Sequence, residues 1–451
     1  MELNENVFEK AILAAVNLPE MGEDECERSL DELESLLDTA GGEVFARVIQ
    51  SKSHPDARTC FGSGKLAELG ELCRNNDIGL VIFDNELSPA QIRNIEKELD
   101  GARVIDRSML ILDIFAMHAV SGEGKLQVEL AQLKYTAPRL TGRGGDMSRL
   151  GGGIGTRGPG ESKLESDRRH LKRRMEQLEY ELYELDKSRL TQRKSRERSG
   201  IKKIAIVGYT NAGKSTLLNT LTGAGILAEN KLFATLDPTT RKYTLPCGDE
   251  ILLTDTVGFI RRLPHHLIKA FKSTLDEAVF ADIIIILIDA TDPEQEEKTA
   301  VCEKLLNELG ADGKPTLFVY NKCDTLDMGA GVGIGADTGV GVSASANSCT
   351  GTDEKRNTLF VSAKTGMGLN ELVNRIEELI HEGKTNEVFI IPNAKQGVIS
   401  RMYEYMTITD VEYGEESVTV RAVADAKARG IFGEYSQNKR EDNGEDDEKW
   451  L

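Results

Sequence analysis

Eight residues carry the clearest signal in this chain: Gly208-Tyr209-Thr210-Asn211-Ala212-Gly213-Lys214-Ser215, between an apolar run at 203–207 and a helical pattern. The pattern is G-x-x-x-x-G-K-[ST] in the strand-to-helix context of a phosphate-binding loop. Glycines let backbone N–H groups close around phosphate oxygens, and the positive end of the following helix points at the same anion. We therefore predict that Lys214 reaches the β- and γ-phosphates and that the Ser215 hydroxyl binds Mg²⁺.

A second signature follows the strand-like run 251–253 and reads Asp255-Thr256-Val257-Gly258. In nucleotide-binding folds a carboxylate at this point lies near Mg²⁺, and a glycine brings a backbone N–H close to the terminal phosphate. We therefore predict that Asp255 lies beside the metal. Gly258 is expected to present its N–H to the γ-phosphate.

Two later signatures concern the base: Asn321-Lys322-Cys323-Asp324 after the run 316–320, and Ser362-Ala363-Lys364 after the run 359–361. Asp324 can accept hydrogen bonds from the ring N1–H and the 2-amino group, which guanine has and adenine lacks. A site built to pair those groups rejects a base without them. The short Ser-Ala-Lys loop suits backbone contact with the guanine oxygen.

Four such signals in order, each at a strand end, predict a GTP-binding α/β domain. We expect a P-loop GTPase domain whose mixed, mostly parallel sheet carries helices on both faces. A small α/β domain and an antiparallel helical hairpin precede it, and a small α+β appendix follows. The predicted activity is Mg²⁺-dependent hydrolysis of GTP to GDP and phosphate.

Between the P-loop helix and Asp255, a loop must carry a threonine that closes onto Mg²⁺ and the γ-phosphate. The segment reads Phe233-Ala234-Thr235-Leu236-Asp237-Pro238-Thr239-Thr240-Arg241. It offers three threonines, and spacing alone does not choose between them.

Phe259 occupies the position after Gly258 where many GTPases have a glutamine that orients the attacking water. In one interpretation Phe259 simply packs on a neighbouring helix. In the other, intrinsic hydrolysis is slow and a partner must order the water. The residue type favours the second, because an aromatic ring cannot activate water.

The bulk composition is that of a soluble globular protein of 451 residues, with 39% hydrophobic and 29% charged residues. That length predicts two to four domains. The first residues lack the basic and apolar regions of a leader, and no run approaches a membrane span. The seven cysteines show no paired C-x-x-C spacing, as expected for reduced thiols in a cytosol. We expect a cytoplasmic protein, with partial peripheral contact with a membrane left open.

Charge is unevenly distributed along the chain. The whole protein carries a net charge of −19, but residues 134–203 hold 19 Lys and Arg against 10 Asp and Glu. The acidic total argues against indiscriminate nucleic-acid binding, whereas a basic module indicates a local electrostatic footprint.

The basic module has the pattern of a helical hairpin. Leucines at 126, 130 and 133 mark a first helix, and leucines from 164 to 185 mark a second, longer one. The loop between them, 141–161, is rich in glycine and carries Arg143, Arg149 and Arg157. Guanidinium groups pair with phosphates or stack on bases, so we predict RNA contact at this tip; the alternative is a passive linker.

Residues 1–120 alternate β and α patterns, which predicts a small parallel-sheet domain. The first 40 residues are weakly patterned, and we expect one or two helices there. Gly62-Ser63-Gly64-Lys65 is either a plain helix N-terminus or a second phosphate site, since a bare G-x-G-K is a poor motif.

The motifs together resemble the translation-factor class of GTPases, and most closely the HflX family, over most of residues 40–325. Phe-Ala-Thr-Leu-Asp is the switch segment of that family, so the resemblance implies that Thr235 and Ser215 bind the metal. It implies catalytic roles for Lys214, Thr235 and Gly258. Nucleotide contacts are expected from Gly208, Tyr209, Thr210, Asn211, Ala212, Gly213, Lys214, Ser215, Phe233, Ala234, Thr235, Leu236, Asp237, Asp255, Thr256, Val257, Gly258, Asn321, Lys322, Cys323, Asp324, Ser362, Ala363 and Lys364.

The resemblance also implies a partner and a task. HflX proteins bind the large ribosomal subunit, set the hairpin loop near the peptidyl-transferase centre and split stalled ribosomes. We expect a monomer that contacts ribosomal RNA through the hairpin tip and does not bind DNA. The alternative is a nucleotide-gated regulator that holds a protein or a non-ribosomal RNA, with incidental hydrolysis.

The expected division is an N-terminal domain (1–120), the hairpin (121–200), the GTPase domain (201–384), a small α+β domain (385–438) and an acidic tail (439–451). The chain departs from the family pattern at 328–356, where we expect a disordered insertion, because residues 328–352 form a Gly/Ala/Ser/Thr tract of low complexity. This tract follows Asp324 closely, so nucleotide affinity is expected to be sensitive to it.

Overall fold

The computed structural model describes residues 9–140, 159–197, 201–223, 232–233, 236–261, 277–311, 313–325, 357–381, 385–424 and 426–437. The chain divides into two compact units, Met1–Asn370 and Glu371–Leu451. Ala234, Thr235, the three tip arginines, most of the predicted tip loop, the insertion 328–356 and the acidic tail 439–451 lie outside the described residues.

The N-terminal part is a four-stranded parallel sheet in the order β2-β1-β3-β4. Its elements are β1 (Glu9–Asn17), α1 (Glu23–Thr39), β2 (Gly42–Ser51), α2 (Ser63–Asn76), β3 (Leu80–Phe83), α3 (Pro89–Glu98), β4 (Arg103–Asp106) and α4 (Arg107–His118). Alternate residues of β1 pack on opposite faces: Leu13 lies in a core with α1 and α4, and Ile12 in a core with α2 and α3. The predicted small parallel-sheet domain is therefore correct.

The prediction for the first 40 residues was wrong in one respect. Residues 9–17 form the inner strand β1 rather than part of a helix. Its residues 11–16 are at most 1% exposed, because the strand is covered on both faces. The run Ala11–Val16 is continuously apolar, as is typical of a strand covered on both faces, and it lacks the alternation that marks a half-exposed strand.

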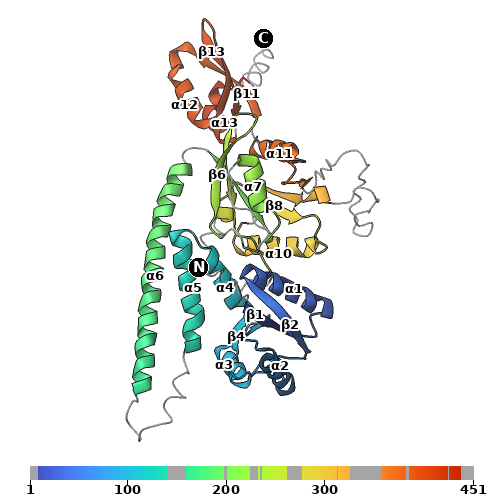
Figure 1. The fold of residues 1–451 in the computed structure, drawn as a ribbon. Helices are drawn as coiled ribbons and strands as arrows, with labels where there is room; N and C mark the ends of the chain where they lie inside the picture. The colour runs from blue at the N-terminus through green and yellow to red at the C-terminus, as the bar shows by residue number, and fades with distance from the viewer. Residues whose placement is uncertain are drawn as a thin grey trace, which may run out of the picture. The chain divides into compact units, whose positions relative to one another are not determined.

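A helical hairpin follows, formed by α5 (Gly122–Leu140) and α6 (Pro159–Glu197), which lie side by side and antiparallel (Figure 1). Ion pairs join the two helices, including Arg189 with Glu123 at 2.8 Å and Lys134 with Glu179 at 2.7 Å. α6 continues through the basic segment that follows Lys187 and ends at Glu197.

The GTPase part is a six-stranded sheet in the order β10-β9-β8-β5-β7-β6, in which only β6 is antiparallel to its neighbour. The elements are β5 (Lys202–Gly208), α7 (Lys214–Thr222), β6 (Thr239–Thr244), β7 (Glu250–Asp255), β8 (Ile283–Asp289), α10 (Gln295–Glu308), β9 (Thr316–Asn321), η3 (Cys323–Thr325) and β10 (Thr358–Phe360). This sheet confirms the predicted fold class. The carboxyl ends of its parallel strands meet at one edge, where the sequence motifs begin.

One hydrophobic cluster joins the N-terminal sheet to the GTPase part. Besides residues of α1, α4 and α5, it contains five GTPase residues that are at most 9% exposed: Tyr209, Phe233, Leu236, Val257 and Ile260. The Phe233 ring lies edge-on to the Phe115 ring of α4, with 4.7 Å between centroids. The P-loop, the switch segment and the segment after Asp255 therefore place apolar side chains in the core of the N-terminal part.

The second unit holds most of α11 (Leu369–His381) and a three-stranded antiparallel sheet in the order β11-β13-β12. Its other elements are β11 (Thr385–Pro392), η4 (Asn393–Lys395), α12 (Gly397–Tyr405), β12 (Thr407–Tyr413), β13 (Ser417–Ala424), α13 (Ala426–Phe432) and η5 (Gly433–Tyr435). Phe389, Met402 and Val420 are fully buried between the sheet and its helices. This is the α+β appendix predicted from the sequence.

Candidate nucleotide-binding site

The P-loop connects β5 to α7 in a conformation that depends on two glycines. Gly213 has φ +94°, and a Cβ atom there would lie 2.4 Å from Nδ2 of Asn321. A Cβ atom on Gly208 would lie 2.3 Å from the Leu287 carbonyl oxygen. Larger residues at these positions would push the loop away from β8 and from the base-recognition motif, so both glycines are sterically required.

Lys214 lies at the start of α7 with only 7% of its surface exposed. Its Nζ donates hydrogen bonds to the carbonyl oxygens of Tyr209, at 2.9 Å, and Gly208, at 3.3 Å. Burial lowers the pKa of Lys214, and the nearby Asp255 carboxylate opposes that shift. A desolvated cation held by two carbonyl groups is ready to pair with an anion that enters the loop.

Ser215 and Asp255 lie together at the ends of α7 and β7. The Ser215 hydroxyl donates to Oδ2 of Asp255 at 2.6 Å, and Asp255 is fully buried. A hydroxyl and a carboxylate are the hard oxygen donors that Mg²⁺ prefers when phosphates and waters complete its shell, so the residues present fit this ion.

A cavity lies beside the P-loop, next to the Thr210 hydroxyl. Thr210 is 7% exposed, and its Oγ1 has no hydrogen-bond partner among the described residues. It lines this cavity of about 360 Å³, which lies between the P-loop, Glu32 of α1 and Lys298 of α10, and whose lining does not include Lys214, Ser215 or Asp324. A buried hydroxyl without a partner is costly, and a polar ligand in this cavity would remove that cost.

Gly258 comes close to the P-loop. A Cβ atom at this position would lie 2.7 Å from Cγ2 of Thr210 and 3.0 Å from Nζ of Lys214. The next residue, Phe259, is 1% exposed and packs in the core with Ala205 of β5 and Ala278. Phe259 therefore packs in the core, and this burial is compatible with both interpretations, since a buried ring cannot orient the attacking water.

At the base-recognition end, Asn321 ties two loops together. Its Nδ2 donates to the Ala212 carbonyl oxygen at 2.8 Å, and its Oδ1 accepts from the Ala363 N–H at 2.9 Å. Asn321 is 2% exposed, so these bonds are shielded from water. They set the distance between the P-loop and the Ser-Ala-Lys loop.

Asp324 is oriented by Ser362, whose hydroxyl donates to Oδ1 of Asp324 at 2.6 Å. Ser362 is fully buried, whereas Asp324 is exposed and open to a ligand. Lys322 has φ +66° and pairs with Asp289 at 2.7 Å, Cys323 is buried, and Lys364 is exposed. The two base motifs predicted from sequence thus lie next to each other at the ends of β9 and β10.

The switch segment is described in part. Phe233 and Leu236 are buried in the cluster that contains Phe115, so their side chains face the N-terminal part. The Asp237 carboxylate accepts hydrogen bonds from the N–H groups of Val120 and Ser121, ahead of α5. Thr256 turns back on β5, where its hydroxyl donates to the Ile206 carbonyl oxygen at 2.9 Å, and Val257 is 5% exposed.

Three family models match consecutive parts of the chain: "GTP-binding GTPase N-terminal" at residues 27–116, "GTP-binding GTPase Middle Region" at 118–196 and "50S ribosome-binding GTPase" at 203–322. GTPase HflX of Caldanaerobacter subterraneus subsp. tengcongensis is 46% identical over 92% of this chain and 90% of that protein. GTPase HflX of Lacrimispora saccharolytica is 46% identical over 97% of this chain and 98% of that protein.

The chain belongs to the HflX family of GTPases. It is a GTP-hydrolysing enzyme, and the resemblance noted in its motifs is confirmed. A GTP-binding protein from Sulfolobus solfataricus, solved in complex with GDP, is 28% identical, covers 83% of this chain and 99% of its own, and gives a TM-score of 0.42. None of the helices in the described parts of the chain is long and apolar enough to cross a bilayer.

In this HflX-family GTPase, a polar network that the sequence analysis missed joins the P-loop to the N-terminal part. The Tyr209 hydroxyl contacts the Glu32 carboxylate of α1 and accepts from the Arg261 N–H at 2.7 Å. Glu32 also pairs with Arg107, which is 3% exposed and donates to Asp84 at 2.8 Å. Burial raises the pKa of Tyr209, and the Glu32 carboxylate raises it further, so the phenol stays protonated.

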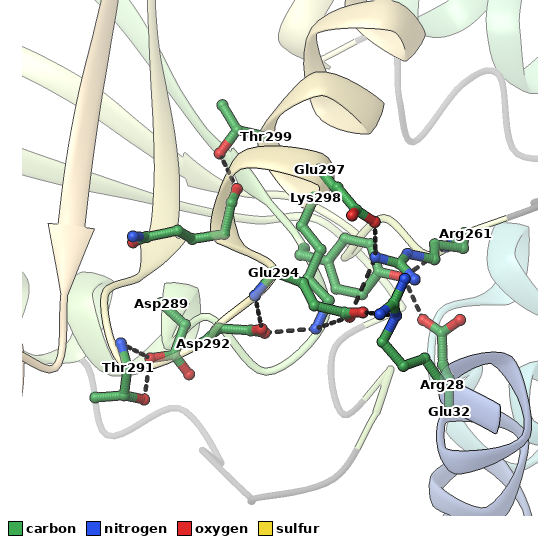
Figure 2. A network of polar contacts seen from close by, with 12 residues as sticks. Arg28, Glu32, Arg261, Asp289, Thr291, Asp292, Glu294, Glu297, Lys298 and Thr299 are labelled. Carbon is green, nitrogen blue, oxygen red and sulfur yellow. Dashed lines mark hydrogen bonds and ion pairs between the residues drawn. The ribbon is translucent and has the colours of Figure 1, made fainter. Parts of the chain in front are cut away.

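Figure 2 shows a second part of this network, centred on Glu294. Glu294 pairs with Arg28 of α1 at 2.5 Å, with Arg261 at 3.1 Å and with Lys298 of α10 at 3.4 Å. Arg261 follows the Asp-Thr-Val-Gly motif by three positions, so the network holds the chain just after that motif. No sequence signal marks these residues, because charged residues at such spacing are usually solvated surface groups.

Proposed function

We propose that this GTPase binds the large ribosomal subunit and uses its nucleotide state to dissociate stalled ribosomes. The observation that carries the proposal is the match of residues 203–322 to a family model described as a 50S ribosome-binding GTPase. The hairpin supports it, since α6 carries the exposed basic residues Arg168, Lys172 and Arg173. The proposed division is an N-terminal α/β domain (1–120), an RNA-binding helical hairpin (121–200), the GTPase domain (201–384) and a small C-terminal α+β domain (385–438).

In the proposed mechanism, GTP enters the P-loop and Lys214 exchanges its carbonyl partners for the β- and γ-phosphates. Asp324, oriented by Ser362, pairs with the guanine ring. Ser215 and Thr235 would ligate Mg²⁺, with Asp255 beside it, and the ion when bound neutralises charge between the phosphates. Gly258 brings its backbone N–H towards the γ-phosphate, because no side chain keeps it from the P-loop.

Hydrolysis by the protein alone is expected to be slow. Phe259 is part of the core and its ring cannot orient a water molecule, so the partner supplies or orders the missing group. We expect large subunits to raise GTP turnover by about tenfold or more, which corresponds to about 1.4 kcal/mol of barrier. Rates would be measured with large subunits, small subunits, intact ribosomes and no addition. Equal turnover in all four would refute the proposal.

The arm is tested by charge reversal at its tip. The variant Arg143→Glu/Arg149→Glu/Arg157→Glu is expected to lose co-sedimentation with large subunits, because phosphate contacts by arginine would become repulsive. The matched control, Arg58→Glu/Lys97→Glu/Arg103→Glu, makes the same charge change at exposed sites of the N-terminal domain and should still co-sediment. Co-sedimentation of the tip variant at the wild-type level would instead favour a regulator with another RNA or protein partner.

The proposal further places the protein in the cytoplasm as a monomer, where it meets ribosomes without a second copy. Light scattering after size exclusion would measure a mass of about 49.6 kDa if this is correct. A mass near twice that value at micromolar concentration would contradict it.

A further inference from the structure

Asp237, the last residue of the Phe-Ala-Thr-Leu-Asp segment, forms hydrogen bonds with the two residues that precede α5, the first helix of the hairpin arm. Its Oδ2 accepts hydrogen bonds from the N–H groups of Val120, at 2.9 Å, and Ser121, at 2.7 Å, and its Oδ1 accepts from the Ser121 hydroxyl at 2.5 Å. Ser121 immediately precedes α5, and its Oγ in turn accepts from the Gly124 N–H at 2.8 Å. One carboxylate thus accepts from both N–H groups just ahead of the helix, while the Ser121 hydroxyl caps the first turn.

The first turn of α5 is shaped to admit this carboxylate. A Cβ atom on Gly124 would lie 2.5 Å from Oδ1 of Asp237, whereas a Cβ atom on Gly122 would meet nothing within 4 Å. Glycine is a poor helix former compared with alanine, so a buried glycine at 124 disfavours the helix locally. Its position is explained by the space that the Asp237 side chain needs.

Asp237 is also rigidly connected to the nucleotide site. The preceding residue, Leu236, is 1% exposed in the core with Phe115. Two residues later β6 begins, and Thr239 pairs in register with Asp255, the carboxylate that holds Ser215. A shift of the chain at Asp255 therefore reaches Asp237 through a paired strand and a single intervening residue.

On the arm side, the contact reaches both helices. Glu123, in the same first turn of α5, pairs with Arg189 of α6 at 2.8 Å and accepts from the Gln127 side chain at 3.0 Å. The base of the hairpin is thus tied to the turn that Asp237 holds.

We propose that Asp237 is a positioning residue that couples the nucleotide state of the GTP site to the base of the hairpin arm through its hydrogen bonds to Val120 and Ser121. The coupling deepens the proposed function, but it depends only on nucleotide binding and involves no ribosome. Because coupling free energies are reciprocal, breaking the contact on the arm must change how the site discriminates GTP from GDP.

The test uses the full chain and breaks the contact from either side. Gly124→Ala places a methyl group against the carboxylate without changing the GTPase part, and Asp237→Ala removes the carboxylate. Gly122→Ala is the matched control, because it makes the same substitution two residues away in open space. Dissociation constants for GDP and for a non-hydrolysable GTP analogue would be measured by fluorescence titration, with thermal unfolding as a check on folding.

We expect the ratio of the two dissociation constants to change about fivefold or more in Gly124→Ala and Asp237→Ala, and to stay at the wild-type value in Gly122→Ala. A merely structural role would weaken both nucleotides alike and leave the ratio unchanged. A change of less than about threefold in both variants overturns the proposal.

A second measurement uses the wild-type protein and therefore does not depend on whether the variants fold. Hydrogen exchange of the amides at 121–127 in the wild-type protein should differ between the GDP and analogue states, and identical exchange in the two states also overturns the coupling. Since both assays omit ribosomes, loss of subunit-stimulated turnover would refute the proposed function while leaving this result intact.

Discussion

Replacing Asp324 by asparagine should change which base the site accepts. The Ser362 hydroxyl can still donate to the remaining side-chain oxygen, because it lies 2.6 Å from Oδ1. The second atom becomes an NH₂ group that faces the 2-amino group of guanine, while the remaining oxygen still accepts from the ring N1–H. One hydrogen bond to a charged acceptor is lost, at about 1.5–3 kcal/mol. This loss weakens GTP binding by roughly 10- to 10²-fold.

Xanthine presents an oxygen where guanine has its 2-amino group, so the side-chain amide introduced by Asp324→Asn can donate to it. We therefore expect xanthosine triphosphate to bind this variant more tightly than GTP does. Competition against a fluorescent nucleotide would measure both affinities. Asp186→Asn, an equal charge change at an exposed position of α6, is the control and should keep the wild-type preference. A loss of GTP affinity below about tenfold in Asp324→Asn would show that this carboxylate does not read the base.

Three further outcomes follow from buried groups. Tyr209→Phe removes the hydroxyl between Glu32 and the Arg261 N–H, and should lower the free energy of unfolding in urea by about 1–3 kcal/mol, whereas Tyr180→Phe at an exposed site should change it by less than about 0.5 kcal/mol. Asn321→Ala leaves the Ala212 carbonyl and the Ala363 N–H unpaired, and should weaken GDP and GTP binding together while lowering the melting temperature; unchanged GDP affinity would contradict this. Burial raises the pKa of the Cys302 thiol from 9.0 to about 12, so the unfolded chain loses this proton at a lower pH than the folded protein does. Between about pH 9.5 and 10.5, the free energy of unfolding should therefore fall by about 1.4 kcal/mol more in wild type than in Cys302→Ala. If the free energy of unfolding of the two proteins changed equally with pH, the raised pKa of Cys302 would be contradicted.

The fold class and the placement of the nucleotide motifs were predictable because their signals are local. The P-loop, the Asp255 motif, the Asn321 motif and the Ser362 motif each sit at the carboxyl end of a strand. Parallel strands bring those ends to one edge of the sheet whatever the rest of the chain does. The helical hairpin was predictable for a similar reason, since leucine spacing reports an apolar helix face directly.

The contacts between the N-terminal and GTPase parts were not predictable. Tyr209, Phe233 and Leu236 were read only as nucleotide contacts, but their side chains pack into a core built by α1, α4 and α5. Asp237 was likewise placed in the switch, and its carboxylate faces the start of α5. Such pairings join residues more than a hundred positions apart, and no local period in the sequence records them.

The burial of Tyr209, Phe233, Leu236, Val257 and Ile260 has a practical consequence for dissecting this enzyme. An excised fragment beginning at residue 201 would expose these side chains to water as a hydrophobic patch, and such patches promote self-association. GTPase rates measured on such a fragment would then differ from those of the full-length enzyme. Mutagenesis within the intact polypeptide is the sound way to apportion roles among its segments.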